Sequence, residues 1–216
     1  MSGWSRRVWA PRLSRRAAAA ASTAPATEAR LRSSHSAGAD GAPVAAPTAR
    51  VFFALWPTPA VATQLHQLAR KAAASDARIM RADTLHLTLA FIGDVAVDRL
   101  PEVEAVGDQT AWPRCTLQLD QLGHWPHNQI LWAGSQSPPD ALAQLADELS
   151  SGLQAIGIRL AARPFVPHVT LARRCRHAQV KAFAPIEWAV EGGVLAVSHR
   201  DATGARYEMC RRWSAA

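Results

Sequence analysis

Apolar and polar positions change their period several times along the chain. Residues 51–56 form an apolar run of the kind that makes a buried strand. Thr58 is suited to cap a helix and Pro59 to stand in its first turn, and apolar residues at helical spacing extend to about Ala74. A short strand is predicted at 79–81. Residues 51–81 are therefore predicted to form a strand, a helix and a second strand, in that order.

The next segment, residues 85–91, alternates strictly between two faces of a predicted strand. One face carries the large apolar side chains: Leu85, Leu87, Leu89 and Phe91. The other carries His86, Thr88 and Ala90. Gly93 and Asp94 are expected to end this strand, and a helix is expected over 97–106.

The second half of the chain repeats this plan. Further strands are predicted at 115–122, 129–133, 158–161, 168–172, 195–198 and 207–212. A helix is predicted from Pro138 to about Ile156, with Gly157 as its C-terminal stop. In the strand at 168–172 one face carries His168, Thr170 and Ala172. Strand, helix and strand thus occur twice, which predicts an α+β protein with two sheet-bearing lobes around a central cleft.

Charge is concentrated at one end of the chain. The net charge is +7, but residues 1–50 hold eight arginines against two acidic residues, which is +6 of that total. Residues 51–216 hold 16 basic and 15 acidic side chains and are nearly neutral. We therefore expect no broad surface that follows a nucleic-acid backbone. A site for one or two phosphates would need only local positive charge.

The N-terminal segment has a different composition from the rest. Residues 1–49 are rich in Ala, Arg, Ser and Pro and have no apolar period, so we predict a disordered extension. A transit-type peptide is the alternative, because the segment is rich in Arg and Ser and poor in acids. Residues 50–216 are predicted to form one two-lobed domain rather than two independent ones.

The apolar runs and the cysteines of the chain indicate where in the cell the protein would be found. No run of about 18 uncharged apolar residues occurs, so no membrane-spanning helix and no membrane partner are expected. The three cysteines have no CxxC spacing, which disfavours a disulfide framework or a thiolate metal site. A reducing compartment fits best, and we expect a cytoplasmic protein.

Two copies of His-x-Thr carry the candidate chemistry: His86 with Thr88, and His168 with Thr170, 82 positions apart. Each copy places an imidazole and a hydroxyl on one face of a strand. Opening a cyclic phosphate needs a base for water and an acid for the departing ribose oxygen, and histidine suits both because its pKa lies near neutrality. Hydroxyls can donate to the phosphate oxygens, where charge builds in the transition state. One such pattern is commonplace, but two on matched strands indicate a site.

Several other histidine, cysteine and tryptophan residues are candidates for a functional role. A zinc site is disfavoured because His124 and His127 lack an obvious third ligand. A Cys175–His177 nucleophile is also disfavoured. Trp56 and Trp125 lie beside predicted turns and could stack on an RNA base, whereas Trp132 is expected in the core. No phosphate-binding loop of the GxxxxGK[ST] type and no GxSxG elbow occur.

The chain resembles the 2H phosphoesterase superfamily and, within it, the RNA 2′,3′-cyclic phosphodiesterases (the ThpR or LigT-like group of the 2′-5′ RNA ligase family). The resemblance runs in order from residue 50 almost to the end of the chain, and the block Arg163–Arg173 points to this subgroup. The matching stretches are 50–57, 85–93, 131–134, 163–173 and 204–208.

The resemblance implies two antiparallel lobes related by a pseudo-twofold, with helices outside and the two motifs facing across the cleft. By similarity His86 would be the proton donor and His168 the proton acceptor. Thr88, Thr170 and Arg173 would hold the phosphate, without metal or cofactor. The product would be a 2′-phosphate with a free 3′-hydroxyl. The implied partner is RNA with a 2′,3′-cyclic phosphate end, tRNA fragments among the candidates, and the protein is expected to be a monomer.

The sequence allows alternatives for two positions and for the function. Strict alternation from Thr170 would turn Arg173 away from the cleft, so either its side chain curls back or Arg174 takes its role. His124 stands where such proteins commonly carry a bulky apolar residue, which puts base or ribose contacts there in doubt. Joining of RNA ends through a 2′–5′ bond is one alternative function. A non-catalytic module that binds RNA ends is another.

Overall fold

The computed structural model describes residues 46–201 and 204–215. Strand β1 (Thr48–Leu55) begins two residues before the domain start predicted at Arg50. The rest of the predicted disordered extension, residues 1–45, lies outside the described residues. No helix of the described ranges is long and apolar enough to cross a membrane.

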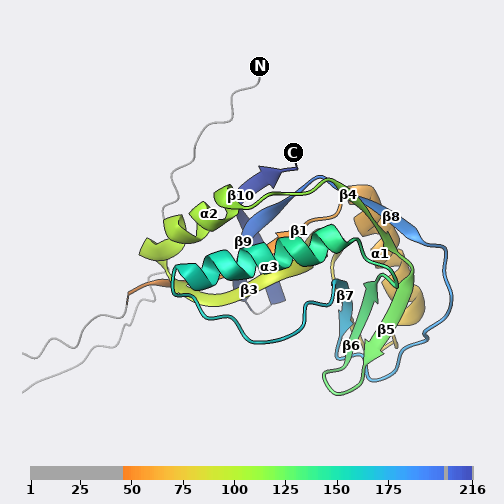
Figure 1. Ribbon diagram of the computed structural model, residues 1–216. Coiled ribbons are helices and arrows are strands. Elements are labelled where there is room, and N and C mark those ends of the chain that lie inside the picture. The colour runs from red at the N-terminus through yellow and green to blue at the C-terminus, as the bar shows by residue number, and fades with distance from the viewer. Residues whose placement is uncertain (1–45, 202–203, 216) are drawn as a thin grey trace, which may run out of the picture. The chain divides into compact units, whose positions relative to one another are not determined.

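Eight of the described strands form one antiparallel sheet (Figure 1), in the order β10-β9-β1-β3-β7-β6-β5 with β2 also on β7. Their bounds, besides β1, are β2 (Arg78–Ile79), β3 (Leu87–Ala96), β5 (Gln121–Trp125), β6 (Ile130–Gly134), β7 (His168–Arg173), β9 (Gly192–Asp201) and β10 (Gly204–Ser214). Strands β4 (Cys115–Leu119) and β8 (Ile186–Val190) pair separately. The fold is α+β with antiparallel sheets, as predicted.

The sheet consists of two halves that meet at one residue pair. Strands β3 and β7 are paired in the described chain only through Leu87 and Val169. Both side chains are fully buried. Past this pair, β3 continues along β1, whereas β7 continues along β6 and β2. The predicted lobes are therefore two half-sheets joined at a narrow seam.

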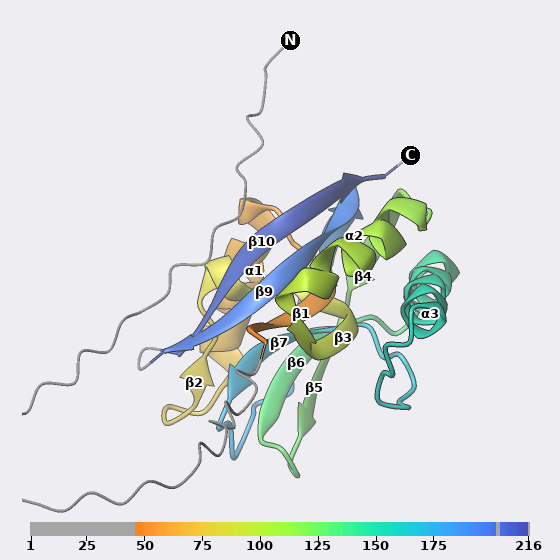
Figure 2. The same ribbon diagram turned by 90° about the vertical axis from the view of Figure 1, so that its left-hand side faces the viewer.

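Each half-sheet is covered by a helix that comes from the other half of the chain (Figure 2). Helix α1 (Pro59–Ala72) follows β1 but packs against β7 and β8. Helix α3 (Asp140–Ala155) follows β6 but packs against β3, and α2 (Leu100–Gln109) lies beside α3 and β10. Short 3₁₀ turns lie at Ala82–Thr84 and Val97–Arg99. This exchange of helices ties the two halves together.

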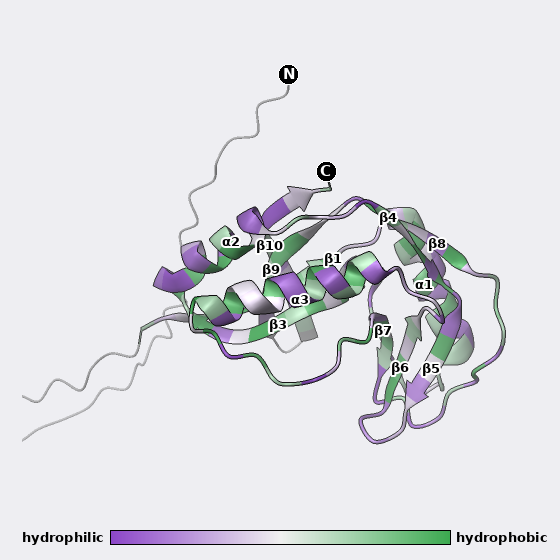
Figure 3. Cartoon of the chain, viewed as in Figure 1, coloured by the Kyte–Doolittle hydropathy of each residue, from purple (hydrophilic) through white to green (hydrophobic). Residues whose placement is uncertain are grey.

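Sequence chemistry explains the helices. The Thr58 Oγ1 accepts a hydrogen bond from the Val61 N–H at 3.4 Å, so the predicted cap of α1 is confirmed. Hydrophobic and hydrophilic residues alternate along α3 (Figure 3), whose buried side is Leu142, Leu145, Ala146, Leu149 and Leu153. These side chains join one core cluster that also contains Leu87 and Val169. One apolar core therefore underlies both half-sheets.

Strand β3 departs from the predicted alternation because it contains bulges. Ala54 pairs with Thr88 and Phe53 with Ala90, so Leu89 is an extra residue on its strand. An extra residue reverses the alternation beyond it. Leu89 and Ala90 are consequently both buried, and Phe91, which we expected inside, is 48% exposed. The strand also continues through Gly93, which has φ +88°, instead of ending there.

Three further segments differ from the sequence predictions. The strand predicted at 115–122 is divided at Asp120, where the chain passes from the β4–β8 pair into the main sheet. Residues 158–161 form no strand, because Ile158 closes helix α3 by donating its N–H to the Leu153 carbonyl. Strand β8 was not predicted, although its buried and exposed residues alternate.

Candidate active site

The two His-x-Thr motifs meet at their middle residues. Leu87 stands between His86 and Thr88, and Val169 stands between His168 and Thr170, and these two middle residues form the seam pair. Because they point into the core, the histidines and threonines point to the opposite face of the sheet. In this antiparallel arrangement His86 lies on the side of Thr170, and Thr88 on the side of His168.

His86 lies in an aromatic surround. Its ring stacks on Trp56, with centroids 5.1 Å apart and planes at 14°. Phe52 and the edge of Tyr207 each lie 4.9 Å from it, centroid to centroid. The His86 Nδ1–H donates to the Thr84 carbonyl at 2.8 Å, because a carbonyl can only accept. This bond leaves Nε2 as the nitrogen that can exchange a proton.

His168 is held in the same way. Its Nδ1–H donates to the Val166 carbonyl at 2.8 Å, again two residues upstream. The Trp125 and His168 rings are nearly perpendicular, with their centroids 4.8 Å apart, and the Trp132 centroid lies at 6.4 Å. His168 is half-buried. The two imidazoles thus share a tautomer and differ in their aromatic neighbours.

Burial lowers the basicity of both imidazoles. Burial among aromatic rings lowers the pKa of His86 to about 4, with smaller contributions from the positive charges of Arg173 and His168. Burial also lowers the pKa of His168, and Arg173 adds to this effect. The hydrogen bonds to Thr84 and Val166 act in the opposite sense. Burial therefore favours the neutral form of both rings.

One cavity of about 340 Å³ collects the predicted residues. Its lining includes His86, Thr88, His168, Thr170 and Arg173. Thr84, Asn128, Arg163 and Tyr207 contribute to its walls as well. The structure therefore places two imidazoles, two hydroxyls and a guanidinium around a single space.

Arg173 reaches this cavity through a bulge. Trp132 pairs with Thr170 and Leu131 with Ala172, so Leu171 is the extra residue in β7. The alternation is reversed beyond it, and Arg173 falls on the same face as Thr170. This bulge is the exact counterpart in β7 of the one at Leu89. Neither the end of the strand nor a curled side chain is needed to explain the position of Arg173.

Arg174, the alternative to Arg173, is placed differently. It is exposed, has φ +54°, and is absent from the lining of both cavities around His86. The structure therefore favours Arg173 as the arginine that faces the histidines.

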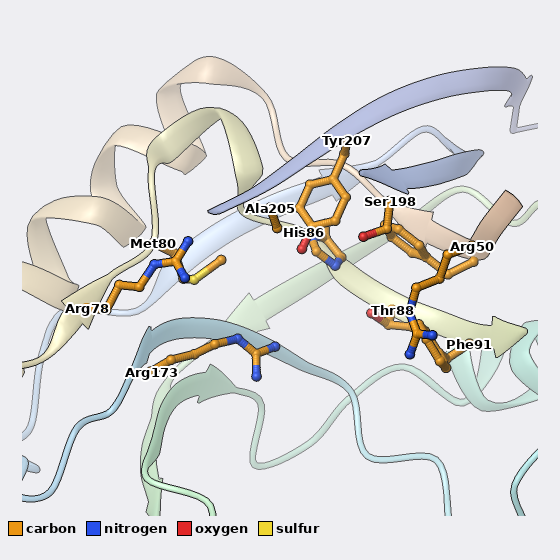
Figure 4. Close-up of a pocket in the computed structure, with 11 residues that line it drawn as sticks. Arg50, Arg78, Met80, His86, Thr88, Phe91, Arg173, Ser198, Ala205 and Tyr207 are labelled. Atoms are coloured by element: carbon orange, nitrogen blue, oxygen red, sulfur yellow. The ribbon is translucent and has the colours of Figure 1, made fainter. Parts of the chain in front are cut away.

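A second cavity of about 390 Å³ adjoins the first on the His86 side (Figure 4). The residues that line both cavities are Met80, His86, Thr88, Arg173 and Tyr207. The further lining of the second cavity is Arg50, Phe52, Arg78, Phe91, Ser198 and Ala205, and His168 and Thr170 take no part in it. The Arg50 guanidinium lies 4.8 Å from the centre of the Phe91 ring.

Two of the three tryptophans, Trp56 and Trp132, are placed differently from the prediction. Trp125 lines the cavity that contains both histidines. Trp56 lines neither cavity, because it lies behind His86. Trp132 was expected in the core, but it packs on the site-facing side, against Trp125 and over Gly123.

Sequence reasoning missed several lining residues. Tyr207, from β10, lines both cavities, and the family resemblance covered its position without assigning it a role. Phe91 stands five residues after His86, as Arg173 stands five residues after His168. Aligning the two motifs on each other could have identified Phe91. Arg50, Arg78 and Ser198 carry no such signal, since they reach the site from other strands.

The residues of the disfavoured zinc and cysteine sites have structural contacts outside the two cavities. The His124 Nε2–H donates to the Cys175 carbonyl at 2.7 Å, and His124 lines neither cavity. The Cys175 thiol is buried and donates to the His177 carbonyl at 3.0 Å. Among residues 46–201 and 204–215, no group of three or more His, Cys, Asp or Glu side chains could hold a metal ion.

Comparison with known proteins gives the arrangement a family. The RNA 2′,3′-cyclic phosphodiesterase of Escherichia coli (strain K12) is 34% identical over 139 residues, which are 63% of this chain and 79% of that protein. A protein of the same name from Thermus thermophilus is 30% identical over 148 residues, covering 60% of this chain and 71% of its own. The crystal structure of E. coli LigT complexed with 3′-AMP matches with a TM-score of 0.70 and 30% identity, covering 78% of this chain and 99% of that one.

The family profile agrees with these relatives. The profile of the 2′-5′ RNA ligase superfamily matches residues 56–202, a range that contains both His-x-Thr motifs and the seam between the half-sheets. The chain therefore belongs to the 2′-5′ RNA ligase superfamily.

Proposed function

We propose that this protein is an enzyme that hydrolyses the 2′,3′-cyclic phosphate at the end of RNA to a 2′-phosphomonoester with a free 3′-hydroxyl. The observation that supports this most directly is the single cavity lined by both histidines and both threonines. The relatives named RNA 2′,3′-cyclic phosphodiesterase support the same reaction.

In the proposed reaction the two histidines act on opposite sides of the phosphorus. Nε2 of His168 takes a proton from water as the water oxygen bonds to phosphorus. The P–O3′ bond breaks, and Nε2 of His86 gives its proton to the departing O3′. Attacking and leaving oxygens lie roughly in line in such a displacement. Hence the terminal ribose lies toward His86 and the water toward His168.

The other residues would bind the phosphate oxygens. The Thr88 and Thr170 hydroxyls can donate hydrogen bonds to the non-bridging oxygens, and the Arg173 guanidinium can pair with their charge. Trp125 offers a face beside His168 for a base, whereas Trp56 supports the His86 ring instead. No metal or cofactor takes part in the proposed steps.

The decisive experiment uses a short RNA with a 2′,3′-cyclic phosphate and ³¹P NMR to assign the product. A 2′-phosphate is expected, with chelator present or absent. His86→Ala and His168→Ala should each lower turnover by about 10²–10⁴-fold, the usual contribution of one proton transfer. His177→Ala, which removes an exposed imidazole outside both cavities, is the control. Near-normal turnover by either site variant would refute the mechanism, and tight binding without turnover in the unaltered protein would indicate a binding module.

End joining is a second candidate because the cavity extends beyond His168. Trp125, Asn128 and Arg163 line that side, where a nucleotide could present its 5′-hydroxyl in place of water. The proton transfers would be unchanged. Adding a 5′-hydroxyl RNA to the same assay tests this, with a 2′–5′ linked product as the expected sign.

The biological setting follows from the proposed chemistry. We infer that the substrate is RNA ends, tRNA fragments among them, acted on by a cytoplasmic monomer. Sedimentation velocity tests the oligomeric state, cell fractionation tests the location, and isolation of RNA crosslinked to the protein tests the substrate.

A further inference from the structure

Two arginines stand opposite each other on the neighbouring strands β2 and β7. Arg78 of β2 and Arg173 of β7 are direct partners in the antiparallel ladder. Side chains in this relation start about 4.5–5.5 Å apart at Cβ. Both line the cavity on the His86 side, and both guanidinium groups point into it in Figure 4.

This pairing is unfavourable in the absence of an anion. Like charges directly opposite in a sheet destabilise it. Arg50, the third arginine of the cavity, is paired with Asp94 at 3.2 Å. Neither the Arg78 nor the Arg173 guanidinium has a hydrogen bond or ion pair with another side chain of the described residues. Two adjacent guanidinium groups without a carboxylate are suited to bind phosphate.

The position of this pair relates it to one part of the substrate. The cavity contains His86 and Thr88 but not His168 or Thr170, so it extends from the donor side of the site. If His86 protonates the departing O3′, the terminal nucleoside lies on that side. The next anionic group of that nucleoside is the phosphate on its 5′ carbon. A cavity of about 390 Å³ has the size of a small-molecule site.

We propose that Arg78 binds the phosphate on the 5′ side of the terminal nucleotide, while Arg173 faces the reacting phosphate. This inference rests on the proposed function. Arg78 thereby makes the protein distinguish an RNA end, which carries this second phosphate, from a cyclic mononucleotide, which lacks it. The contact persists through the reaction, so its effect lies in binding rather than in the chemical step.

The test compares two product-like ligands by titration calorimetry: adenosine 2′-monophosphate and adenosine 2′,5′-bisphosphate. In the unaltered protein the second phosphate should tighten binding about tenfold, which corresponds to about 1.4 kcal/mol. In Arg78→Gln this ratio should fall close to one. The salt dependence for the bisphosphate should decrease by about one unit of slope, by analogy with loss of one phosphate contact.

Arg70→Gln is the matched control, since it removes one arginine from the exposed side of α1, outside both cavities. It should keep the tenfold ratio. Equal affinities of the unaltered protein for the two ligands would overturn the proposal. So would an Arg78→Gln variant that weakens both ligands by the same factor, which would assign Arg78 to the 2′-phosphate.

The outcome can be separated from that of the proposed function, because the titrations need no turnover. Hydrolysis of a cyclic phosphate with equal affinities leaves the proposed function standing and removes the role of Arg78. A tenfold higher affinity for the bisphosphate, without hydrolysis of the cyclic phosphate, would support the role of Arg78 and refute the proposed function. Circular dichroism confirms the fold of each variant, and the two-ligand comparison in the unaltered protein does not depend on any substitution.

Discussion

At the scale of single residues, His86 and His168 are held by the same backbone contact and differ in what covers them. Trp56, Phe52 and Tyr207 surround His86. His168 is more open, with two tryptophan edges beside it. Burial favours the neutral ring in both cases. A proton donor must nevertheless hold a proton when the substrate is in place, so the bound phosphate itself has to supply the stabilising charge.

This requirement predicts proton uptake on binding. With its pKa lowered to about 4, His86 is neutral near pH 7 in the empty site. A bound phosphate dianion favours the charged ring and raises that pKa, so adenosine 2′-monophosphate should bind with uptake of a proton and more weakly as pH rises. Calorimetry in buffers of different ionisation enthalpy measures the uptake. The double variant His86→Gln/His168→Gln should abolish most of it, because the bound phosphate favours the charged form of both rings, and binding without uptake in the unaltered protein would contradict this account.

At the scale of elements, the bulges in β3 and β7 shape the site. Each inserts one residue after a His-x-Thr motif, at Leu89 and Leu171. Each moves a residue that simple alternation would bury or turn away, Phe91 or Arg173, onto the face that carries the histidines. Both half-sheets thus contain a bulge at the same distance from the histidine. In one it brings the aromatic ring of Phe91 to the site, and in the other the guanidinium of Arg173.

The sequence was informative where the pattern is local. The cap at Thr58, the apolar side of α3 and the shared face of His168 and Thr170 follow from spacing within one element. The bulges were not predicted, because Leu89 and Leu171 are each followed by an alanine. An extra apolar residue there does not visibly interrupt the alternation of the strand.

Contacts between residues that are distant in the sequence could not be predicted from local patterns. Tyr207 and Arg78 reach the cavities around His86 from other strands, and the exchange of helices leaves no periodic signal. The resemblance to a family, rather than periodicity, provided the expectation that the two motifs face one another. Periodicity by itself predicted only that the histidine and threonine of each motif lie on the same face of a strand.

One element-scale prediction concerns Gly123, which pairs with Trp132 across β5 and β6. A Cβ at Gly123 would come within 2.0 Å of the Trp132 ring. Gly123→Ala should therefore displace that ring, lower the free energy of unfolding by about 1–3 kcal/mol and lower turnover through His168, which Trp132 contacts. In a Trp132→Val background the same substitution should cost little, because the clash is gone. Chemical denaturation of the four proteins gives the answer, and additive costs would exclude the clash.

At the scale of the whole molecule, the narrow seam and the exchanged helices predict joint unfolding of the two half-sheets. Leu87 is fully buried at the seam, so Leu87→Ala should cost about 2–5 kcal/mol. Tryptophan fluorescence and far-ultraviolet circular dichroism should still report one coincident transition. Val180→Ala, at an exposed position, should leave stability unchanged. Two separate transitions in the Leu87 variant would show that the halves fold independently.

The matching carbonyl contacts of the two imidazoles have a consequence for successive reaction cycles. In the proposed hydrolysis His86 ends without the proton it began with, and His168 ends with one it lacked. Since both rings are fixed in the same tautomer, this final state is the starting state for ring closure, in which His86 would accept a proton and His168 would donate one. Each forward event therefore leaves the pair set for the reverse event until solvent exchanges the two protons. The pace of that exchange would limit how soon the next forward cycle can begin.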